Sequence, residues 1–252
     1  MAQKQKRKME YKDFDRMVNE VEGTSRRSFS PSLTFPALMR KVYVWMTLAM
    51  AITGITAYGV ANSPAILEMI FGNRLVFWGM IIAELALVFG ISGMLNRLSL
   101  TTATLMFVAY SVINGAVLSS IFLVYTMESI GNVFFITAGT FGAMALIGYT
   151  TKKDLTSMGR ILFMALIGLI IATVVNIFVG STGMQTIISY LGVLIFVGLT
   201  AYDSQKIKMM LMDMDAYDEG AQKLALIGAL TLYLDFINLF LYLLRIFGGK
   251  RE

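Results

Sequence analysis

Several residue types that usually carry chemistry are missing from this chain. It contains no cysteine, which excludes disulfide bonds and thiolate metal or redox sites. It contains no histidine either, which argues against Ser-His catalysis and zinc hydrolysis. Proton exchange near neutral pH must then use carboxyl groups, because the side chain that normally titrates in this range is absent. We therefore expect no enzymatic activity and no tightly bound cofactor.

Charged residues are scarce and unevenly placed. Only 15% of the 252 residues are charged and 57% are hydrophobic, whereas soluble domains carry about 25% charged residues. Ten of the 21 Lys and Arg residues fall within residues 1–41. The formal net charge is +5, but in so apolar a chain a basic excess is more typical of membrane topology signals than of nucleic-acid binding. The composition predicts an integral membrane protein that binds no nucleic acid.

Long apolar runs make up most of the remaining chain. Seven of them have, or nearly have, the roughly 20 residues that a helix needs to cross a bilayer. Their approximate bounds are residues 42–61, 76–95, 101–124, 132–149, 161–180, 187–203 and 224–247. They lack the alternation of membrane β-barrel strands, so each is expected to satisfy its backbone as a helix. The sequence predicts an all-α polytopic membrane helix bundle at residues 42–249, after a basic, partly disordered arm at residues 1–41.

The basic residues between these runs predict the orientation. Seventeen of the 21 Lys and Arg lie in the arm and in the second, fourth and sixth loops, whereas the first, third and fifth loops contain only Arg74. This asymmetry places the N-terminus and the even-numbered loops in the cytoplasm. A full crossing by the seventh run would put Arg245, Lys250 and Arg251 outside. A hairpin or half-crossing would keep them inside, and the sequence leaves both open.

Small residues at helical spacing predict close packing between helices. Ser111, Gly115 and Ser119 recur every four residues in the third run. Gly139 and Ala143 repeat this spacing in the fourth. Small residues let the backbones of membrane helices approach each other, so we interpret both stripes as packing surfaces rather than functional sites.

Three acidic residues lie inside the apolar runs. They are Glu84 in the second, Asp203 at the end of the sixth and Asp235 in the middle of the seventh. An acid at the bilayer centre costs about 2.5–3.5 kcal/mol even on insertion scales, so such residues usually have a function. Asp235 lies eleven residues after Leu224, roughly 16 Å into the membrane. Asn238 shares its helical face and would extend the polar patch.

The two aspartates are predicted to come together. A short loop joins the sixth and seventh runs, so these helices are expected to be antiparallel neighbours. Asp203 can meet Asp235 if the sixth helix continues past Lys208. Carboxylates about 4 Å apart repel by roughly 4 kcal/mol at an effective dielectric constant near 20, so the pair would share one proton. Such a pair would sense pH, and Ca²⁺ could replace the proton, since Ca²⁺ prefers carboxylate and carbonyl oxygens.

Two further charged residues have alternative interpretations. Glu84 could line the same cavity as the aspartates, or it could be a hydrogen-bonded acid that bridges two helices. Arg97, at the cytoplasmic end of the second run, could reach inward to an aspartate or extend to the membrane interface. The sequence leaves both questions open.

Two motifs around the aspartates resemble those of a known family. They are Gly198-Leu-Thr-Ala-Tyr-Asp203-Ser-Gln-Lys-Ile207 and Ala229-Leu-Thr-Leu-Tyr-Leu-Asp235-Phe-Ile-Asn238-Leu-Phe, the latter followed by Leu243-Leu-Arg-Ile-Phe-Gly248. Through these motifs, residues 40–249 resemble the transmembrane Bax-inhibitor-motif family in its bacterial form. The resemblance implies six helices around a central seventh, and a pH-sensitive Ca²⁺ leak in the bacterial cytoplasmic (inner) membrane. It also implies that Asp203 and Asp235 form the pH-sensing pair and that Arg97 pairs with it as a latch.

Three functions compete at this stage. The first is a proton-gated leak, in which Ca²⁺ is the transported ion and the aspartates bias a two-state seventh helix. The second is an intramembrane aspartyl protease. Two features count against it: Leu232-Tyr-Leu precedes Asp235 where such a protease would have Gly-x-Gly, and the chain has no proline after Pro64. The third is a non-transporting regulator of membrane-anchored quality-control proteases or cell-death-type proteins, with the arm as docking segment. We expect the leak.

Overall fold

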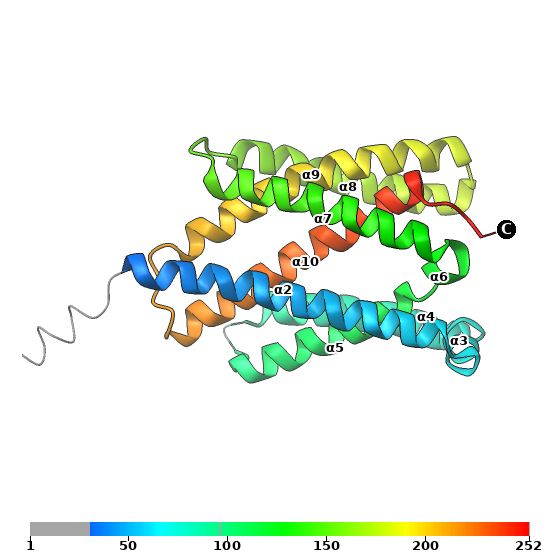
Figure 1. Cartoon of the computed structure of the whole chain (residues 1–252), viewed down its shortest axis with the longest axis horizontal. Helices are drawn as coiled ribbons and strands as arrows, with labels where there is room; N and C mark the ends of the chain where they lie inside the picture. Colours follow the sequence, from blue (N-terminus) through cyan, green and yellow to red (C-terminus); the bar gives the residue numbers. More distant parts are fainter. Residues whose placement is uncertain (1–30, 96, 252) are drawn as a thin grey trace, which may run out of the picture.

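The computed structural model describes residues 31–95 and 97–251, and the regular structure in these ranges is helical apart from one isolated bridge. The helices are α2 (Pro31–Ala61), α3 (Pro64–Phe71), α4 (Arg74–Gly93), α5 (Leu100–Leu118), α6 (Ile121–Val124), α7 (Met127–Thr150), α8 (Thr156–Val179), α9 (Thr182–Leu211) and α10 (Glu219–Phe247) (Figure 1). Seven spans in the described ranges are long and apolar enough to cross a membrane, with α5 and α6 forming one of them. The predicted all-α membrane bundle is confirmed.

Helix α10 lies at the centre of the bundle. Helices α2, α5, α7 and α9 pack directly on it, whereas α4 packs on α5 and α8 packs on α9 (Figure 1). The most apolar stretch of α10 is 61% buried, against 6% for the corresponding stretches of α4 and α8. Lipid can surround apolar outer helices, but polar groups on the central helix need partners within the protein.

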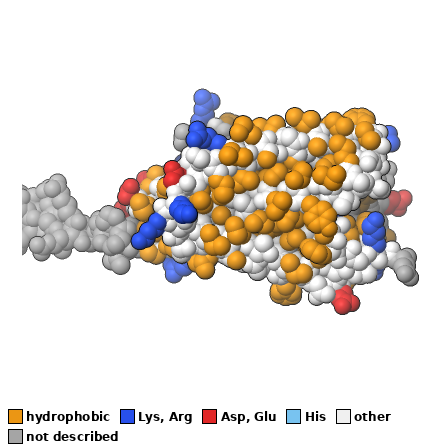
Figure 2. Space-filling view, turned by 90° about the horizontal axis from the view of Figure 1, so that it is seen from above, with side chains coloured by type: hydrophobic (Ala, Val, Ile, Leu, Met, Phe, Trp, Pro, Cys, Tyr) orange, Lys and Arg blue, Asp and Glu red, His pale blue; other side chains and the backbone are white. Residues whose placement is uncertain are grey.

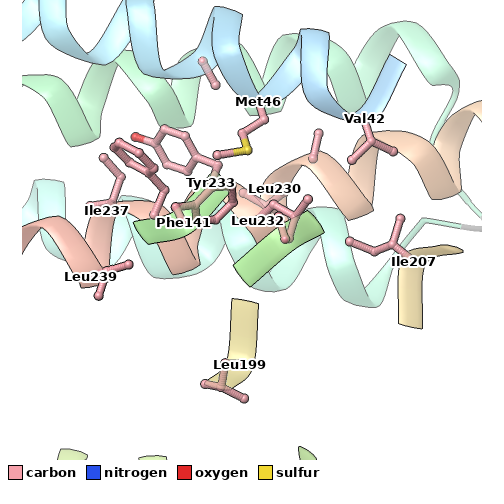
Figure 3. Packing of buried hydrophobic residues seen from close by; sticks show 14 of the residues in the cluster. Val42, Met46, Phe141, Leu199, Ile207, Leu230, Leu232, Tyr233, Ile237 and Leu239 are labelled. Carbon is pink, nitrogen blue, oxygen red and sulfur yellow. The ribbon is translucent and has the colours of Figure 1, made fainter. Parts of the chain in front are cut away.

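The surface and the interior of the bundle are both apolar, as lipid solvation allows. On the face seen in Figure 2, hydrophobic side chains spread over the middle of the bundle, and charged side chains lie toward its two ends. Inside, Leu232 and Tyr233 of α10 are fully buried. Figure 3 shows Tyr233 near Phe141 of α7 and Met46 of α2, which belong to the same buried cluster. This core fixes α10 among its neighbours.

Helix α2 begins at Pro31, eleven residues before the predicted start of the first run at Val42. Its second turn contains Pro36, and Leu38 and Met39 are buried in the core. The hydropathy pattern did not predict this part of the helix, because the charged residues Arg40 and Lys41 interrupt the apolar run. Burial of the apolar side chains before them stabilises the helix there. Residues 31–41 of the predicted arm therefore belong to the bundle, and residues 1–30 lie outside the described residues.

Helix α10 runs the length of the bundle. Its 29 residues extend about 43 Å, and the chain after it packs on the connection between α6 and α7. There the N–H of Thr126 donates to the Gly249 carbonyl (3.1 Å), and the N–H of Arg251 donates to the Val124 carbonyl (2.9 Å). This connection lies at the opposite end of the bundle from the start of α2 (Figure 1). Of the two alternatives for the seventh run, the structure shows an unbroken full-length helix rather than a hairpin.

Candidate functional site

Asp203 and Asp235 meet where α9 packs on α10. Helix α9 continues past Lys208 to Leu211, which is the condition that the sequence set for this contact. Asp203 lies in the last third of α9, and Asp235 lies near the middle of α10. Both side chains are buried, with 9% and 4% of their residue surfaces exposed. The two carboxyl groups lie close enough to interact with each other.

This pair lacks the donors that a buried carboxylate usually has. Oδ2 of Asp235 is enclosed, and no donor in the described residues reaches it. Two carboxyl groups form a hydrogen bond only when one of them keeps its proton, because ionised carboxylates only accept. The positive charge of Lys206 acts on Asp203, but the two side chains form no ion pair. Within the described ranges, the only ion pair is Lys223–Glu219. The arrangement can hold one shared proton, or a cation in its place.

A cavity of about 870 Å³ between α8, α9 and α10 reaches the pair. Besides the aspartates, its polar or charged lining residues are Arg160, Tyr202, Lys206, Thr231, Asn238 and Tyr242. Most of the remaining lining is apolar, as at Phe163, Ile170 and Phe196. Among the residues that line this cavity, the aspartates are thus the only acids, and Arg160 and Lys206 are the basic side chains.

The other predicted site residues do not all reach this cavity. Asn238 lines it, and its Nδ2 donates to the Leu234 carbonyl (2.8 Å). Glu84 is not part of the lining, because α4 packs on α5 outside the helices that surround α10. Arg97 is exposed in the connection between α4 and α5 and forms no ion pair with any described residue. The structure thus brings Asn238 to the aspartates, but not Glu84 or Arg97.

Glu84 ends a separate chain of hydrogen bonds through the bundle. Its Oε1 accepts from Nδ2 of Asn114 (3.0 Å), which links α4 to α5. Oδ1 of Asn114 accepts from the Tyr233 hydroxyl (2.9 Å), which also lies 2.7 Å from Oγ1 of Thr53. Tyr233 and Asp235 are two residues apart on one helix, so they project about 200° apart. Helix α10 therefore carries polar contacts on two nearly opposite faces.

Side chains next to Asp203 hold α9 against α7 and the following loop. Oγ of Ser204 donates to the Ala145 carbonyl (2.8 Å). The Gln205 amide accepts from the N–H of Leu155 and donates to the Lys153 carbonyl, both at 2.8 Å. Neither role could be predicted from the sequence, because the partners are backbone groups, which every residue has and which no side-chain pattern indicates. These contacts fix the part of α9 that carries the Asp203 carboxyl group.

Comparisons with known proteins agree with the motifs around the aspartates. The family described as "Inhibitor of apoptosis-promoting Bax1" has a model that matches residues 36–252. The chain is 50% identical over 222 residues to the inner membrane protein YbhL of Escherichia coli strain K12, covering 88% of this chain and 95% of that protein. It is 40% identical over 251 residues to an uncharacterised protein of Caulobacter vibrioides, covering 95% and 99% of the two chains.

Proposed function

Because the chain belongs to the Bax inhibitor-1 family of membrane proteins, we propose that it is a pH-sensitive calcium leak channel gated by Asp203 and Asp235. The observation that carries this proposal is the close approach of two buried carboxyl groups, together with the Oδ2 atom of Asp235, which receives no hydrogen bond from any described residue. The name of the relative YbhL supports a location in the bacterial inner membrane.

The shared proton would act as the gate. While it is present, the carboxyl groups attract each other across the contact between α9 and α10. When it dissociates, like charges at about 4 Å repel by roughly 4 kcal/mol at an effective dielectric constant near 20. That energy shifts the equilibrium between two states of a helix contact about 10³-fold. The flux of Ca²⁺ is therefore expected to rise as the pH rises through the range in which this proton is lost.

The pair fits Ca²⁺ as passing cargo rather than as a resident cofactor. Ca²⁺ takes six to eight oxygen ligands, and the described residues contain no group of three or more acidic, His or Cys side chains that could hold a metal. The aspartates would supply some of those ligands, with Asn238 and Thr231 nearby in the cavity wall. Water would supply the rest, so binding would be weak enough for the ion to leave.

The test is Ca²⁺ flux into dye-loaded liposomes that contain the purified full-length protein, measured between about pH 5 and pH 8. Asp235→Asn is expected to abolish the pH dependence and to keep flux low, because an amide can donate to Asp203 at every pH. Asp154→Asn is the matched control, since Asp154 is an exposed acid in the loop after α7. Hydrogen bonds from Thr156 hold the pKa of Asp154 below its usual range, so it stays ionised throughout the titration.

Three outcomes would contradict the proposal. A titration profile of Asp235→Asn that matches the wild type would remove the pair from gating. A lack of Ca²⁺ flux at every pH would leave a non-transporting regulator of membrane proteases or cell-death-type proteins as the alternative function. Cleavage of a model membrane peptide, lost in Asp203→Ala, would instead favour the aspartyl protease.

A further inference from the structure

A lateral groove lies between α2 and α7. Both helices pack on α10 but make few close contacts with each other, and a cavity of about 650 Å³ separates them, with Phe236 of α10 at its base. Its lining extends over residues 36–50 of α2 and 138–149 of α7, which are about 21 Å and 16 Å of helix. The groove shares no lining residue with the cavity at the aspartates.

The wall of this groove suits a hydrocarbon chain. Met39, Met46 and Met50 contribute flexible apolar side chains from α2. On α7, a Cβ added at Gly142 would meet nothing within 4 Å, so the glycine leaves free space. The hydroxyl of Thr47 donates to the Tyr43 carbonyl (2.8 Å) and thus needs no partner in the groove. The groove is long and mostly apolar, and it opens on the surface of the bundle, where Thr47, Gly142 and Leu146 are exposed.

One end of the groove carries unpaired positive charge. There the rings of Phe35 and Tyr149 stack with centroids 6.2 Å apart. Nζ of Lys208 donates to the Tyr149 carbonyl (2.8 Å) and lies 5.2 Å from the centre of its ring. Lys208 is half-buried, and no carboxylate in the described residues forms an ion pair with it. Lys152 and Lys153 are exposed just after α7. Cations at the end of an apolar groove indicate an amphiphile with an anionic head.

We propose that this groove binds an acyl chain of an anionic phospholipid from the surrounding bilayer, with the phosphate headgroup at Lys208. The chain's own N-terminal arm matches this positive end poorly, because residues 1–30 contain eight Lys and Arg but only five Asp and Glu. Their net positive charge would be repelled by Lys208. A phospholipid matches both the apolar wall and the positive end. This site does not depend on calcium leak, so it can be tested without any flux measurement.

The binding test is native mass spectrometry of the detergent-purified full-length protein, titrated with dioleoyl phosphatidylglycerol, dioleoyl phosphatidylcholine or oleate. Gly142→Leu is expected to weaken phosphatidylglycerol binding about tenfold, because the added side chain fills the groove. Gly139→Leu is the matched control on α7, since a Cβ there also meets nothing within 4 Å but the residue does not line the groove. Lys208→Gln is expected to weaken phosphatidylglycerol binding about fivefold and to leave phosphatidylcholine binding unchanged.

A second measurement uses only the wild-type protein, so it does not depend on how the variants fold. Phosphatidylglycerol with a photoactivatable acyl chain is expected to crosslink to residues 36–50 and 138–149. Equal phosphatidylglycerol affinity in Gly142→Leu and Gly139→Leu would overturn the proposal. Crosslinks confined to the outer faces of α4 and α8 would also overturn it. The same holds if residues 1–30 or a second copy occupy the groove, or if equimolar oleate displaces phosphatidylglycerol.

Discussion

Around Asp203, most of the motif residues serve to position one carboxyl group. Ser204 and Gln205 bind backbone groups of α7 and of the loop after it. The backbone of Ala201 lies directly against Gly148, where an added Cβ would clash with the Ala201 carbonyl oxygen. The sequence predicted Asp203 because a charge in lipid is costly. It did not predict these supports, because backbone contact depends on how the helices are placed.

The small residues of α7 illustrate this limit. The sequence predicted close packing at Gly139, but a Cβ there would meet nothing within 4 Å. The close approach is at Gly148 instead. In α5 the predicted stripe does pack closely, since a Cβ at Gly115 would lie 2.5 Å from the Thr53 carbonyl oxygen. Spacing alone cannot distinguish a small residue that faces a helix from one that faces lipid.

A pair of substitutions in α7 tests this difference. Gly148→Ala is expected to destabilise the protein by about 1–3 kcal/mol, because the methyl group must force α7 and α9 apart. Gly139→Ala adds the same methyl group to the same helix in open space and is expected to change stability by less than about 0.5 kcal/mol. Unfolding in detergent mixed with increasing dodecyl sulfate, followed by circular dichroism, measures both. Equal stability of the two variants would contradict the close contact.

At the scale of the helix, α10 has two polar sides with different partners. Asp235 faces Asp203 on α9, whereas Tyr233 bonds to Asn114 of α5 and lies beside Thr53 of α2. The seven spans could be predicted because lipid forces each apolar run into a helix. The ends of these helices were less predictable. Helix α9 continues to Leu211 and α10 begins at Glu219, beyond the apolar runs predicted at residues 187–203 and 224–247, because the polar ends of both helices lie outside the range that hydropathy detects.

The Tyr233 side of α10 is expected to contribute stability without sensing pH. Tyr233→Phe removes the hydroxyl that donates to Asn114, so we expect a loss of about 1 kcal/mol in the free energy of unfolding. The pH dependence of Ca²⁺ flux should remain, because the aspartates lie on the other side. Tyr190→Phe is the control, since Tyr190 of α9 is 56% exposed. A flattened pH profile in Tyr233→Phe would show that the two sides are not independent.

For the whole molecule, the decisive feature is that α10 passes through the bundle from end to end. The loop after α7 then lies at one end, and the chain after Phe247 lies at the other (Figure 1). The distribution of basic residues predicted an inward-facing N-terminus, but it could not settle α10, because Arg245, Lys250 and Arg251 oppose the bias. The continuous helix places these three residues at the end opposite the loop after α7.

Cysteine labelling can test this topology, because the chain has no cysteine of its own. Single variants Lys153→Cys and Lys250→Cys place a thiol at opposite ends of the bundle. In intact spheroplasts, a membrane-impermeant maleimide is expected to label Lys250→Cys, and to label Lys153→Cys only after lysis. Labelling of both variants from the same side would contradict the full crossing.

The position of α10 in the chain also affects how the protein is made. The central helix is synthesised after the four helices that pack on it, so α2, α5, α7 and α9 enter the membrane before α10 exists. Until then Thr53, Asn114 and Asp203 lack the partners that α10 supplies. A nascent or truncated chain that stops before Glu219 would expose these groups to lipid or to other proteins. Such chains should be recognised by membrane proteases and degraded faster than the complete protein.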